Sequence, residues 1–335
     1  MSTPSSVADV GEHALIARVR DRVPPAPDWV AVGVGDDAAV VEPARNLLEV
    51  VTTDAMVEGV HFDRAFTPPA AIGHRALAAN LSDLAAMGAA PRSALLSFVL
   101  PPALPLADFD AMLDGFMALA AAHDVTLIGG NITRSPGPLL VDVSAIGTVR
   151  RRRVLTRAGA RPGDEVWVSG EIGSAAAGLQ SLSAGAPDRQ AMAGCEAAFL
   201  SPEPRVRLGC LLGRNRAATS SVDLSDGLAD GLHQLAAASA VGLVVDAAAI
   251  PLADAARGWF EGRGGDPVLA AIAGGDDYEL LFTVRPRERR RLDAVRRQAR
   301  GVPLTRIGVV VREPGVVLAR GGMSGPVPSG YIHFR

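Results

Sequence analysis

Short runs of β-branched residues alternate with longer Ala- and Leu-rich stretches along the chain. Between residues 107 and 123, apolar side chains recur every three or four positions, which predicts an amphipathic helix. Residues 70–87 are rich in good helix formers and predict another. A mixed α/β fold follows, although this pattern leaves the order of the strands open. In the first half, the predicted helices are Ala70–Met87 and Ala107–His123, and the predicted strands are Leu47–Thr53, Ser93–Leu100, Val125–Ile128 and Leu139–Val149.

The amino-acid composition changes near residue 150. A run of four arginines, Arg150–Arg153, is followed by the turn-rich stretch RAGARPGD, so we place a domain boundary between about 150 and 163. Helices are expected between the strands of the second half, with surface loops at Ser183–Asp188 and Gly262–Asp266. The predicted strands of this half are Glu165–Ser169, Ser220–Leu224, Tyr278–Val284 and Thr305–Val311.

All 33 basic residues among the 335 of the chain are Arg, because the sequence contains no Lys. This excludes mechanisms that need a Lys, such as the Walker A phosphate loop, the protein-kinase strand Lys and a pyridoxal Schiff base. A protein of this composition must handle phosphate with Arg, backbone amides or metal ions. The formal net charge of −3 argues against nucleic-acid binding, and Arg285–Arg300 is interpreted as a solvated helix face.

Further observations concern the compartment. Cys195 and Cys210 form no metal-binding or redox spacing and are expected to be reduced thiols. The first ten residues lack the basic and apolar regions of a secretory signal. No stretch approaches the roughly 18 uncharged apolar residues that span a membrane. We therefore expect a cytoplasmic protein with no membrane and no nucleic acid among its partners.

Asp residues recur in short motifs, several of them placed directly after predicted strands. An isolated Asp in that position is commonly a turn former or a helix N-cap, and Asp226 could simply cap the apolar helix that follows it. Asp83 differs, because a carboxylate inside an Ala/Leu helix needs a cation or a hydrogen-bond network. The motifs are GVGDD (33–37), TTD (52–54), NLSD (80–83), GGNITR (129–134), DLSDG (223–227) and GGDDYE (274–279).

Taken together, these motifs supply carboxylate and hydroxyl oxygens, which hard divalent cations prefer. His and Cys are nearly absent from them, which disfavours zinc. The residues therefore predict several magnesium ions that bridge a polyphosphate and provide the neutralising charge that Lys would otherwise supply.

As an ordered set, these motifs closely resemble the thiamine-monophosphate kinase family. The resemblance rests on GVGDDAAVV, TTDAMVEGVHF, NLSDLAAMGAAP, GGNITRS, VDLSDGL and GGDDYELLFTV, and runs from about Gly11 to the segment 330–334. It implies an α/β (α+β) protein with the two-domain aminoimidazole-ribonucleotide-synthetase-like fold. Residues 1–152 would form an ATP- and Mg-binding dimerisation domain with a barrel-like dimer core, and residues 153–335 a C-terminal α/β domain. The implied reaction converts ATP and thiamine monophosphate to ADP and thiamine diphosphate, with Mg2+, in a homodimer.

The resemblance also implies roles for individual residues. Asn131 stands where the family has a metal-binding Asp, and Asp276 stands where it has Glu, so both ligand shells are altered. The implied metal ligands are Asp37, Thr52, Thr53, Asp54, Asp83, Asn131, Asp223 and Asp226. The implied ATP contacts are Gly130, Asn131, Arg157 and Ser225, and the implied substrate contacts are His61, Asp276 and Tyr331.

The expected mechanism is direct in-line phosphoryl transfer with no catalytic general base. The second pKa of a phosphate monoester is about 6, so the acceptor is already largely dianionic. Arg157 and Arg134 would assist as fixed cations. Alternatives stay open: another acceptor, as in aminoimidazole-ribonucleotide or selenophosphate synthetases, or a nucleotide-binding scaffold without turnover. His61 and Tyr331 could instead be packing residues, and Gly170–Ser174, which resembles a phosphate loop, is explained by a strand-to-helix turn.

Overall fold

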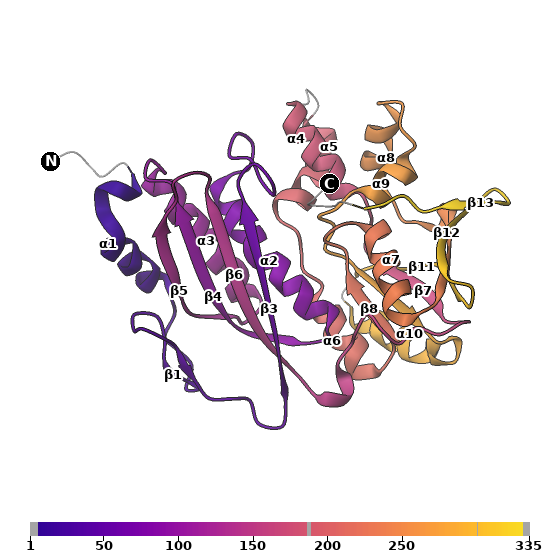
Figure 1. Cartoon of the computed structure of the whole chain (residues 1–335), viewed down its shortest axis with the longest axis horizontal. Coiled ribbons are helices and arrows are strands. Elements are labelled where there is room, and N and C mark those ends of the chain that lie inside the picture. The colour runs from indigo at the N-terminus through magenta and orange to yellow at the C-terminus, as the bar shows by residue number, and fades with distance from the viewer. Residues whose placement is uncertain (1–5, 186–188, 300, 331–335) are drawn as a thin grey trace. The chain divides into compact units, whose positions relative to one another are not determined.

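The computed structural model describes residues 6–185, 189–299 and 301–330 and divides into two compact units (Figure 1). The N-terminal unit holds the chain up to Leu84 together with Ala90–Arg150. The C-terminal unit holds the short segment Ala85–Ala89 and the chain from Arg151 onward. No helix within the described ranges is long and apolar enough to cross a membrane.

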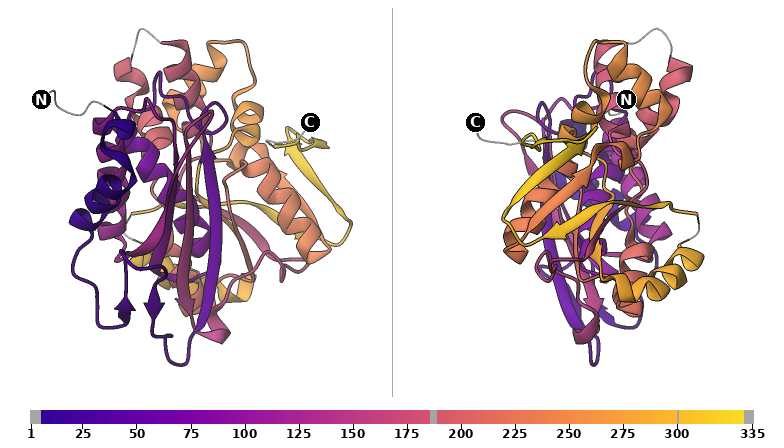
Figure 2. Two further views of the ribbon diagram at one scale, coloured as in Figure 1. Left: turned by 60° about the vertical axis from the view of Figure 1, so that its left-hand side comes forward. Right: turned by 90° about the vertical axis from the view of Figure 1, so that its right-hand side faces the viewer.

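The N-terminal unit is built on a four-stranded sheet in the order β3-β6-β4-β5, in which only β4 and β5 run parallel. Helices α2 and α3 cover one face of this sheet (Figure 2). Its elements are α1 (Val7–Arg22), β1 (Val30–Val32), β2 (Val40–Val41), β3 (Leu48–Val57), α2 (Pro69–Ala86), β4 (Ala90–Leu100), α3 (Leu106–Ala122), β5 (Thr126–Arg134) and β6 (Leu140–Val149).

Burial alternates along the strands of this sheet, as expected when one face is covered and the other is not. In β6, Val141, Val143 and Ala145 are fully buried, and the residues between them are partly exposed. On β3, Val51 points away from the helices and is 66% exposed. The face opposite α2 and α3, called the open face below, therefore has no covering layer among the described residues of its own unit.

The C-terminal unit contains a seven-stranded sheet in the order β13-β12-β9-β11-β7-β10-β8. Its strands are β7 (Glu165–Ser169), β8 (Ser220–Asp223), β9 (Gly242–Asp246), β10 (Leu280–Val284), β11 (Leu304–Val311), β12 (Gly315–Arg320) and β13 (Met323–Pro326). Its α-helices are α4 (Ser174–Ala184), α5 (Arg189–Leu200), α6 (Val206–Asn215), α7 (Leu228–Ser239), α8 (Asp254–Glu261), α9 (Pro267–Ala273) and α10 (Arg289–Gln298).

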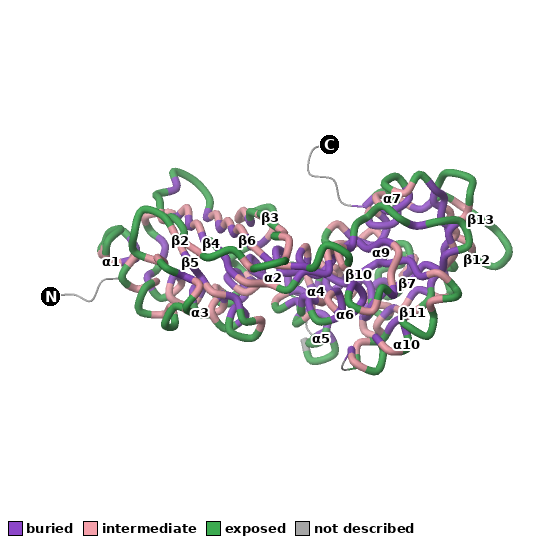
Figure 3. Tube along the Cα trace, turned by 90° about the horizontal axis from the view of Figure 1, so that it is seen from below, coloured by how far each residue is buried: buried purple, intermediate pink, exposed green. Residues whose placement is uncertain are grey.

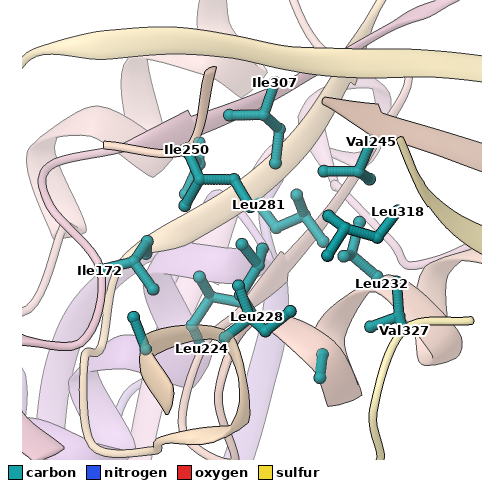
Figure 4. Close-up of a cluster of buried hydrophobic side chains, with 14 of the residues drawn as sticks. Ile172, Leu224, Leu228, Leu232, Val245, Ile250, Leu281, Ile307, Leu318 and Val327 are labelled. Atoms are coloured by element: carbon teal, nitrogen blue, oxygen red, sulfur yellow. The ribbon is translucent and has the colours of Figure 1, made fainter. Parts of the chain in front are cut away.

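The core of this unit is aliphatic. Leu228 and Leu232 of α7 pack toward Leu281 of β10 and Val245 of β9 (Figure 4). Every residue of β7, β8 and β10 is buried, and Figure 3 marks the buried stretches in purple. β7 (EVWVS) and β10 (LLFTV) lie inside the sheet with both faces covered, which explains their short continuous apolar runs, whereas β8 (SSVD) is an edge strand and largely polar.

Most predicted elements are confirmed, α2, α3 and β7 almost to the residue. The Arg-rich stretch is a helix, α10, that buries only Leu292 and Val295, in agreement with a solvated face. Two predicted strand ends are wrong. β3 continues through Thr52–Asp54 to Val57, and β5 continues through the whole GGNITR motif to Arg134. Both extensions follow from unbroken backbone pairing, of β3 with β6 and of β5 with β4.

Candidate functional site

The predicted ligands on β3 are divided between the two faces of the sheet. Thr52 pairs with Ala145 and Asp54 with Val143, and both partners are fully buried on the helix-covered face. Thr53 lies between them and points to the open face, where its hydroxyl lies 3.0 Å from Ser144 Oγ and donates to the carbonyl of Val143 at 3.1 Å. Because successive side chains of a strand point to opposite faces, Thr52 and Asp54 of the TTD motif lie on the helix-covered face and Thr53 lies on the open face.

Asp83 of α2 meets β3 on the helix-covered face. The hydroxyl of Thr52 donates a hydrogen bond to Asp83 Oδ2. Asn80, one turn before Asp83 on the same helix, is fully buried and donates to the carbonyl of Ala76 at 3.1 Å. The sequence predicted a cation or a hydrogen-bond network for this carboxylate, and the structure shows one such hydrogen bond, from Thr52 of the sheet.

Gly130 and Asn131 lie within β5 and not, as predicted, in a loop that follows a strand. A Cβ at Gly130 would collide with the carbonyl oxygen of Leu96 on β4, so the close approach of the two strands requires glycine there. Asn131 is exposed and pairs with Ser97 on the open face.

One candidate was missed by the sequence reasoning. Asp142 of β6 lies in the same cross-strand row as Ser97 and Asn131, and its Oδ1 is 3.4 Å from the hydroxyl of Thr53. The available signal was a lone carboxylate at a half-buried position of an alternating strand. Asp142 adds a negative charge to the open face next to Thr53.

Asp37 and His61 lie in loops of the same unit. Asp37 is exposed before β2, and its N–H donates to Asp36 Oδ1 at 2.8 Å. His61 is half-buried in a tight turn directly after β3, and its Nδ1 accepts a hydrogen bond from the Val57 N–H at 3.0 Å. The predicted N-terminal residues thus occupy the sheet, one helix and two loops.

In the C-terminal unit, the DLSDG and GGDDYEL motifs form two loops joined through their backbones. Asp276 N–H donates to the carbonyl of Ser225 at 2.7 Å, and Tyr278 N–H donates to that of Leu224 at 3.0 Å. Gly227 has a φ of 93°, and a Cβ there would collide with the carbonyl oxygen of Gly274. The structure therefore brings Asp223, at the end of β8, Ser225, Asp226 and Asp276 together on neighbouring loops.

Asp226 is not the N-cap of α7, since that position is held by Gly227. The capping explanation that the sequence left open for Asp226 is therefore wrong. The backbone bonds to Ser225 and Leu224 hold the loop in place, and its conformation does not depend on a cap formed by Asp226.

The three acidic residues of GGDDYEL have three different surroundings. Asp276 has a left-handed backbone with φ of 65°, an uncommon conformation for a non-glycine residue, and its Oδ1 accepts from the Tyr278 hydroxyl at 3.1 Å. Glu279 is buried and accepts hydrogen bonds from Ser169 and from Arg205, whose Nε lies 2.7 Å away. Burial by itself would lower the pKa of the Arg205 guanidinium. The hydrogen bonds that Arg205 donates to Glu279, together with the negative charge of that residue, outweigh this effect and raise the pKa.

Asp277 is the third acidic residue, and its carboxylate contacts the backbone at the N-terminal end of α4. Its carboxylate oxygens accept from the Gly173 N–H at 3.0 and 3.2 Å. Burial raises the pKa of this carboxyl well above its ordinary value of 3.8. Residues 170–173 connect β7 to α4, so the prediction of a strand-to-helix turn at Gly170–Ser174 is confirmed, and Asp277 accepts from the Gly173 N–H of this turn.

Of the remaining predicted residues, the two arginines are exposed. Arg157 is exposed, and its carbonyl accepts from the Ser239 hydroxyl at 3.1 Å. Arg134 is exposed at the end of β5. Tyr331 lies outside the described residues. Both Cys195 and Cys210 are free thiols, and burial raises the pKa of each.

The donor set suits magnesium held jointly with phosphate. Within the described ranges, no three His, Cys, Asp or Glu side chains come together closely enough to hold an ion alone. Magnesium in phosphate-transfer sites is commonly bound by one or two carboxylates together with water and substrate phosphates. The carboxylate of Asp83, in contact with the Thr52 hydroxyl, and that of Asp54, which lies on the same face of β3 as Thr52, fit that mode.

Comparisons with known proteins agree with this architecture. Residues 35–149 match the AIR synthase related protein N-terminal domain, and residues 161–320 match its C-terminal domain. The fold and the oxygen-rich site thus define a two-domain protein of the AIR synthase related class. The predicted fold is confirmed in this respect, whereas the barrel-like dimer core stays a prediction.

Individual relatives define the family more narrowly. Thiamine-monophosphate kinase of Escherichia coli (strain K12) is 38% identical over 334 residues, 97% of this chain and 98% of its own length. The crystal structure of thiamine-monophosphate kinase from Stenotrophomonas maltophilia K279a is 41% identical, with a TM-score of 0.83 over 95% of this chain and 98% of that one. AaThiL complexed with AMPPCP and TMP is 30% identical, with a TM-score of 0.78 over 99% and 100% of the two chains. The chain belongs to the thiamine-monophosphate kinase family.

Proposed function

We propose that this chain is a thiamine-phosphate kinase that transfers the γ-phosphoryl group of ATP to thiamine monophosphate. The observation that carries the proposal is the whole-length relationship to thiamine-monophosphate kinases, one of which is complexed with an ATP analogue, AMPPCP, and TMP. The contact between Thr52 and Asp83 supports it, because it brings a carboxylate of α2 to the strand that carries Asp54.

Each unit carries residues that we assign to magnesium binding. In the N-terminal unit we assign Asp37, Thr52, Thr53, Asp54, Asp83 and Asn131 to the metal ions, and in the C-terminal unit Asp223 and Asp226. Gly130, Asn131, Arg157 and Ser225 would contact ATP, and His61, Asp276 and Tyr331 would contact thiamine monophosphate. When bound, the ions supply positive charge that screens the repulsion between donor and acceptor phosphates.

The chain's own residues would contribute by positioning. The acceptor phosphate is already largely dianionic near neutral pH, because its second pKa is about 6, so no side chain must remove a proton from it. Holding two anions in line removes much of the entropic barrier of a bimolecular reaction. Residues fixed on β3 and α2, and loops fixed by backbone bonds such as Asp276 to Ser225, provide this rigidity.

We also propose a homodimer formed through the open face of the N-terminal sheet and a cytoplasmic location, where ATP is available. The exposed apolar residues of that face, Val51 at 66% and Leu95 at 37%, support an interface. In this proposal the N-terminal domain, residues 1–152, provides ATP binding and dimerisation, and residues 153–335 form the second domain. Sedimentation equilibrium is expected to give twice the chain mass, and a monomer at micromolar concentration would refute the interface.

The reaction is tested by measuring thiamine diphosphate formed from ATP and thiamine monophosphate while magnesium is varied. Asp54→Ala should lower kcat/KM about 10³-fold, the equivalent of about 4 kcal/mol in the barrier. Glu49→Gln is the matched control, because Glu49 is an exposed carboxylate of the same strand that points to the open face. It should change kcat/KM by less than twofold.

The two alternatives give different results in this assay. ATP hydrolysis or transfer only to another acceptor would indicate a related enzyme with a different substrate. ATP binding without any product would indicate a scaffold without turnover. Equal activity of Asp54→Ala and the native chain would contradict the assignment of the acidic residues.

A further inference from the structure

His61 sits in a turn that is tied together at every position. Its N–H donates to the carbonyl of Val57 at 2.9 Å, and the Gly59 N–H donates to the carbonyl of Phe62 at 2.8 Å. Glu58 accepts from the Leu139 N–H at 3.0 Å and from Arg64 Nε at 2.7 Å. Val60 is 54% exposed, but its N–H also donates to the carbonyl of Val57, at 3.1 Å, so each residue of the sequence EGVHF takes part in the turn.

The imidazole of His61 folds back on this turn. Its Nδ1 accepts from the Val57 N–H at 3.0 Å, so Nδ1 carries no hydrogen. In the neutral ring the hydrogen is then on Nε2. The turn thus selects one tautomer, in which Nε2–H is the hydrogen-bond donor of the ring.

Arg75 of α2 supports the same turn from inside the protein. Its side chain has 0% of its surface exposed, and Nη2 donates to the carbonyl of His61 at 3.2 Å. A buried guanidinium costs free energy unless acceptors surround it, so an apolar side chain would fill this helix position at lower cost. One of the groups that Arg75 holds is thus the backbone of the residue whose imidazole accepts from the Val57 N–H.

We propose that Arg75 is a positioning residue for acceptor binding: through the His61 carbonyl it fixes the turn that holds the imidazole as an Nε2–H donor to thiamine monophosphate. This inference rests on the proposed function, in which His61 contacts the substrate. It assigns to Arg75 a role in acceptor affinity and none in ATP binding or in the transfer step.

Steady-state kinetics separate this role from a merely structural one. Arg75→Met should raise KM for thiamine monophosphate about tenfold, with KM for ATP and kcat changed by less than twofold. Arg75→Lys, which keeps one donor, should recover part of the loss. Arg64→Met is the matched control, because Arg64 contacts the same turn through Glu58 but from the solvent side, and it should change each constant by less than twofold.

A double-mutant cycle tests whether Arg75 acts through His61. If it does, adding Arg75→Met to His61→Ala should raise KM no further than His61→Ala alone. Additive effects, or a parallel rise in KM for ATP, would overturn the proposal. His61→Gln, whose amide reaches the position of Nε2, should retain more affinity than His61→Asn, whose amide reaches that of Nδ1.

The ring can also be observed in the resting protein, without turnover. Nitrogen-15 NMR of the native chain should show His61 with hydrogen on Nε2, and Arg75→Met should increase the other tautomer. A native ring with hydrogen on Nδ1 would overturn the proposal even if every arginine variant failed to fold. Failure of the chain to phosphorylate thiamine monophosphate would instead refute the proposed function and leave this tautomer result as a separate finding.

Discussion

The two units hold their acidic residues in opposite ways. In the N-terminal unit, Asp54 and Asp83 project from a ten-residue strand and from a helix. In the C-terminal unit, Asp226 and Asp276 lie in loops whose shape depends on backbone bonds and on left-handed φ angles, 65° at Asp276. Regular elements fix side-chain direction by periodicity, whereas loops fix it by individual backbone angles.

This difference determines how neighbouring residues separate. Thr52 and Thr53 point to opposite faces because a strand alternates. Asp276 and Asp277 also separate, one toward the Tyr278 hydroxyl and the other toward the Gly173 N–H, but there the cause is the local backbone conformation. We therefore expect side-chain changes to matter most in the N-terminal unit and glycine changes to matter most in the C-terminal loops.

Gly227→Ala should have the largest effect on stability. Its positive φ and the collision of a Cβ with the Gly274 carbonyl should together lower the free energy of unfolding by about 4 kcal/mol, measured by urea denaturation. Gly163→Ala is the matched control, because Gly163 has a similar φ of 91° with nothing within 4 Å of the added methyl group. It should cost about 1 kcal/mol. Equal losses would show that strain alone, and not the joined loops, requires glycine.

Thr52→Val tests the helix-covered face. Removing the donor to Asp83 should raise the magnesium concentration for half-maximal velocity about tenfold, as changes beside a metal ligand typically do. Thr53→Val, on the open face, removes one assigned hydroxyl ligand but no contact with an assigned carboxylate, so it should raise that concentration by a smaller factor, about threefold. If the two variants behave alike, the division of this motif between two faces has no functional meaning.

Asn131→Asp tests the open face by adding a carboxylate to it instead of removing a hydroxyl. An added carboxylate should lower the magnesium concentration for half-maximal velocity about fivefold, since two charges about 4 Å apart in water interact by about 1 kcal/mol. Thr133→Asp, two residues along the same face of β5, should leave the requirement unchanged. The same shift from both variants would indicate a general effect of charge instead of a ligand position.

Asp266→Asn should have the smallest effect, and the quantity it changes is the stability of the C-terminal unit. Asp266 accepts from the N–H groups of Val268 and Leu269 at the start of α9, and its hydrogen bond with Arg320 lowers the pKa of the carboxyl to about 2. A lowered pKa means that the stabilisation is present above the ordinary value of 3.8 and is lost as pH falls through about 2. The variant should lose about 0.5 kcal/mol at pH 7, and the difference in Tm should shrink on acidification. A constant difference would contradict this assignment.

The sequence predicted the elements well where the periodic signal was long. Helices α2 and α3 and the buried strand β7 followed from apolar spacing and helix propensity. The ends of β3 and β5 did not, because Asp, Asn and Gly within strands look like turn residues unless the pairing of a neighbouring strand is known. Helix α1, Val7–Arg22, was missed because its residues show no strong apolar face.

The candidate site was predicted as a set of motifs but not as an arrangement. The partner of Asp83 is Thr52, 31 positions earlier, and only the contact between α2 and β3 shows this pairing. The support of His61 by Arg75 depends on a packed helix that no local motif indicates. Asp142 was overlooked because the row that it shares with Asn131 exists only in the folded sheet.

The central claim is that thiamine monophosphate itself accepts the phosphoryl group. Phosphorus-31 NMR of the native chain with ATP, magnesium and either thiamine monophosphate or thiamine tests it most directly. The account predicts the paired phosphate signals of thiamine diphosphate, growing as the γ-phosphate of ATP disappears, only with thiamine monophosphate and only with magnesium. Release of free phosphate without that product, or transfer to thiamine, would contradict it.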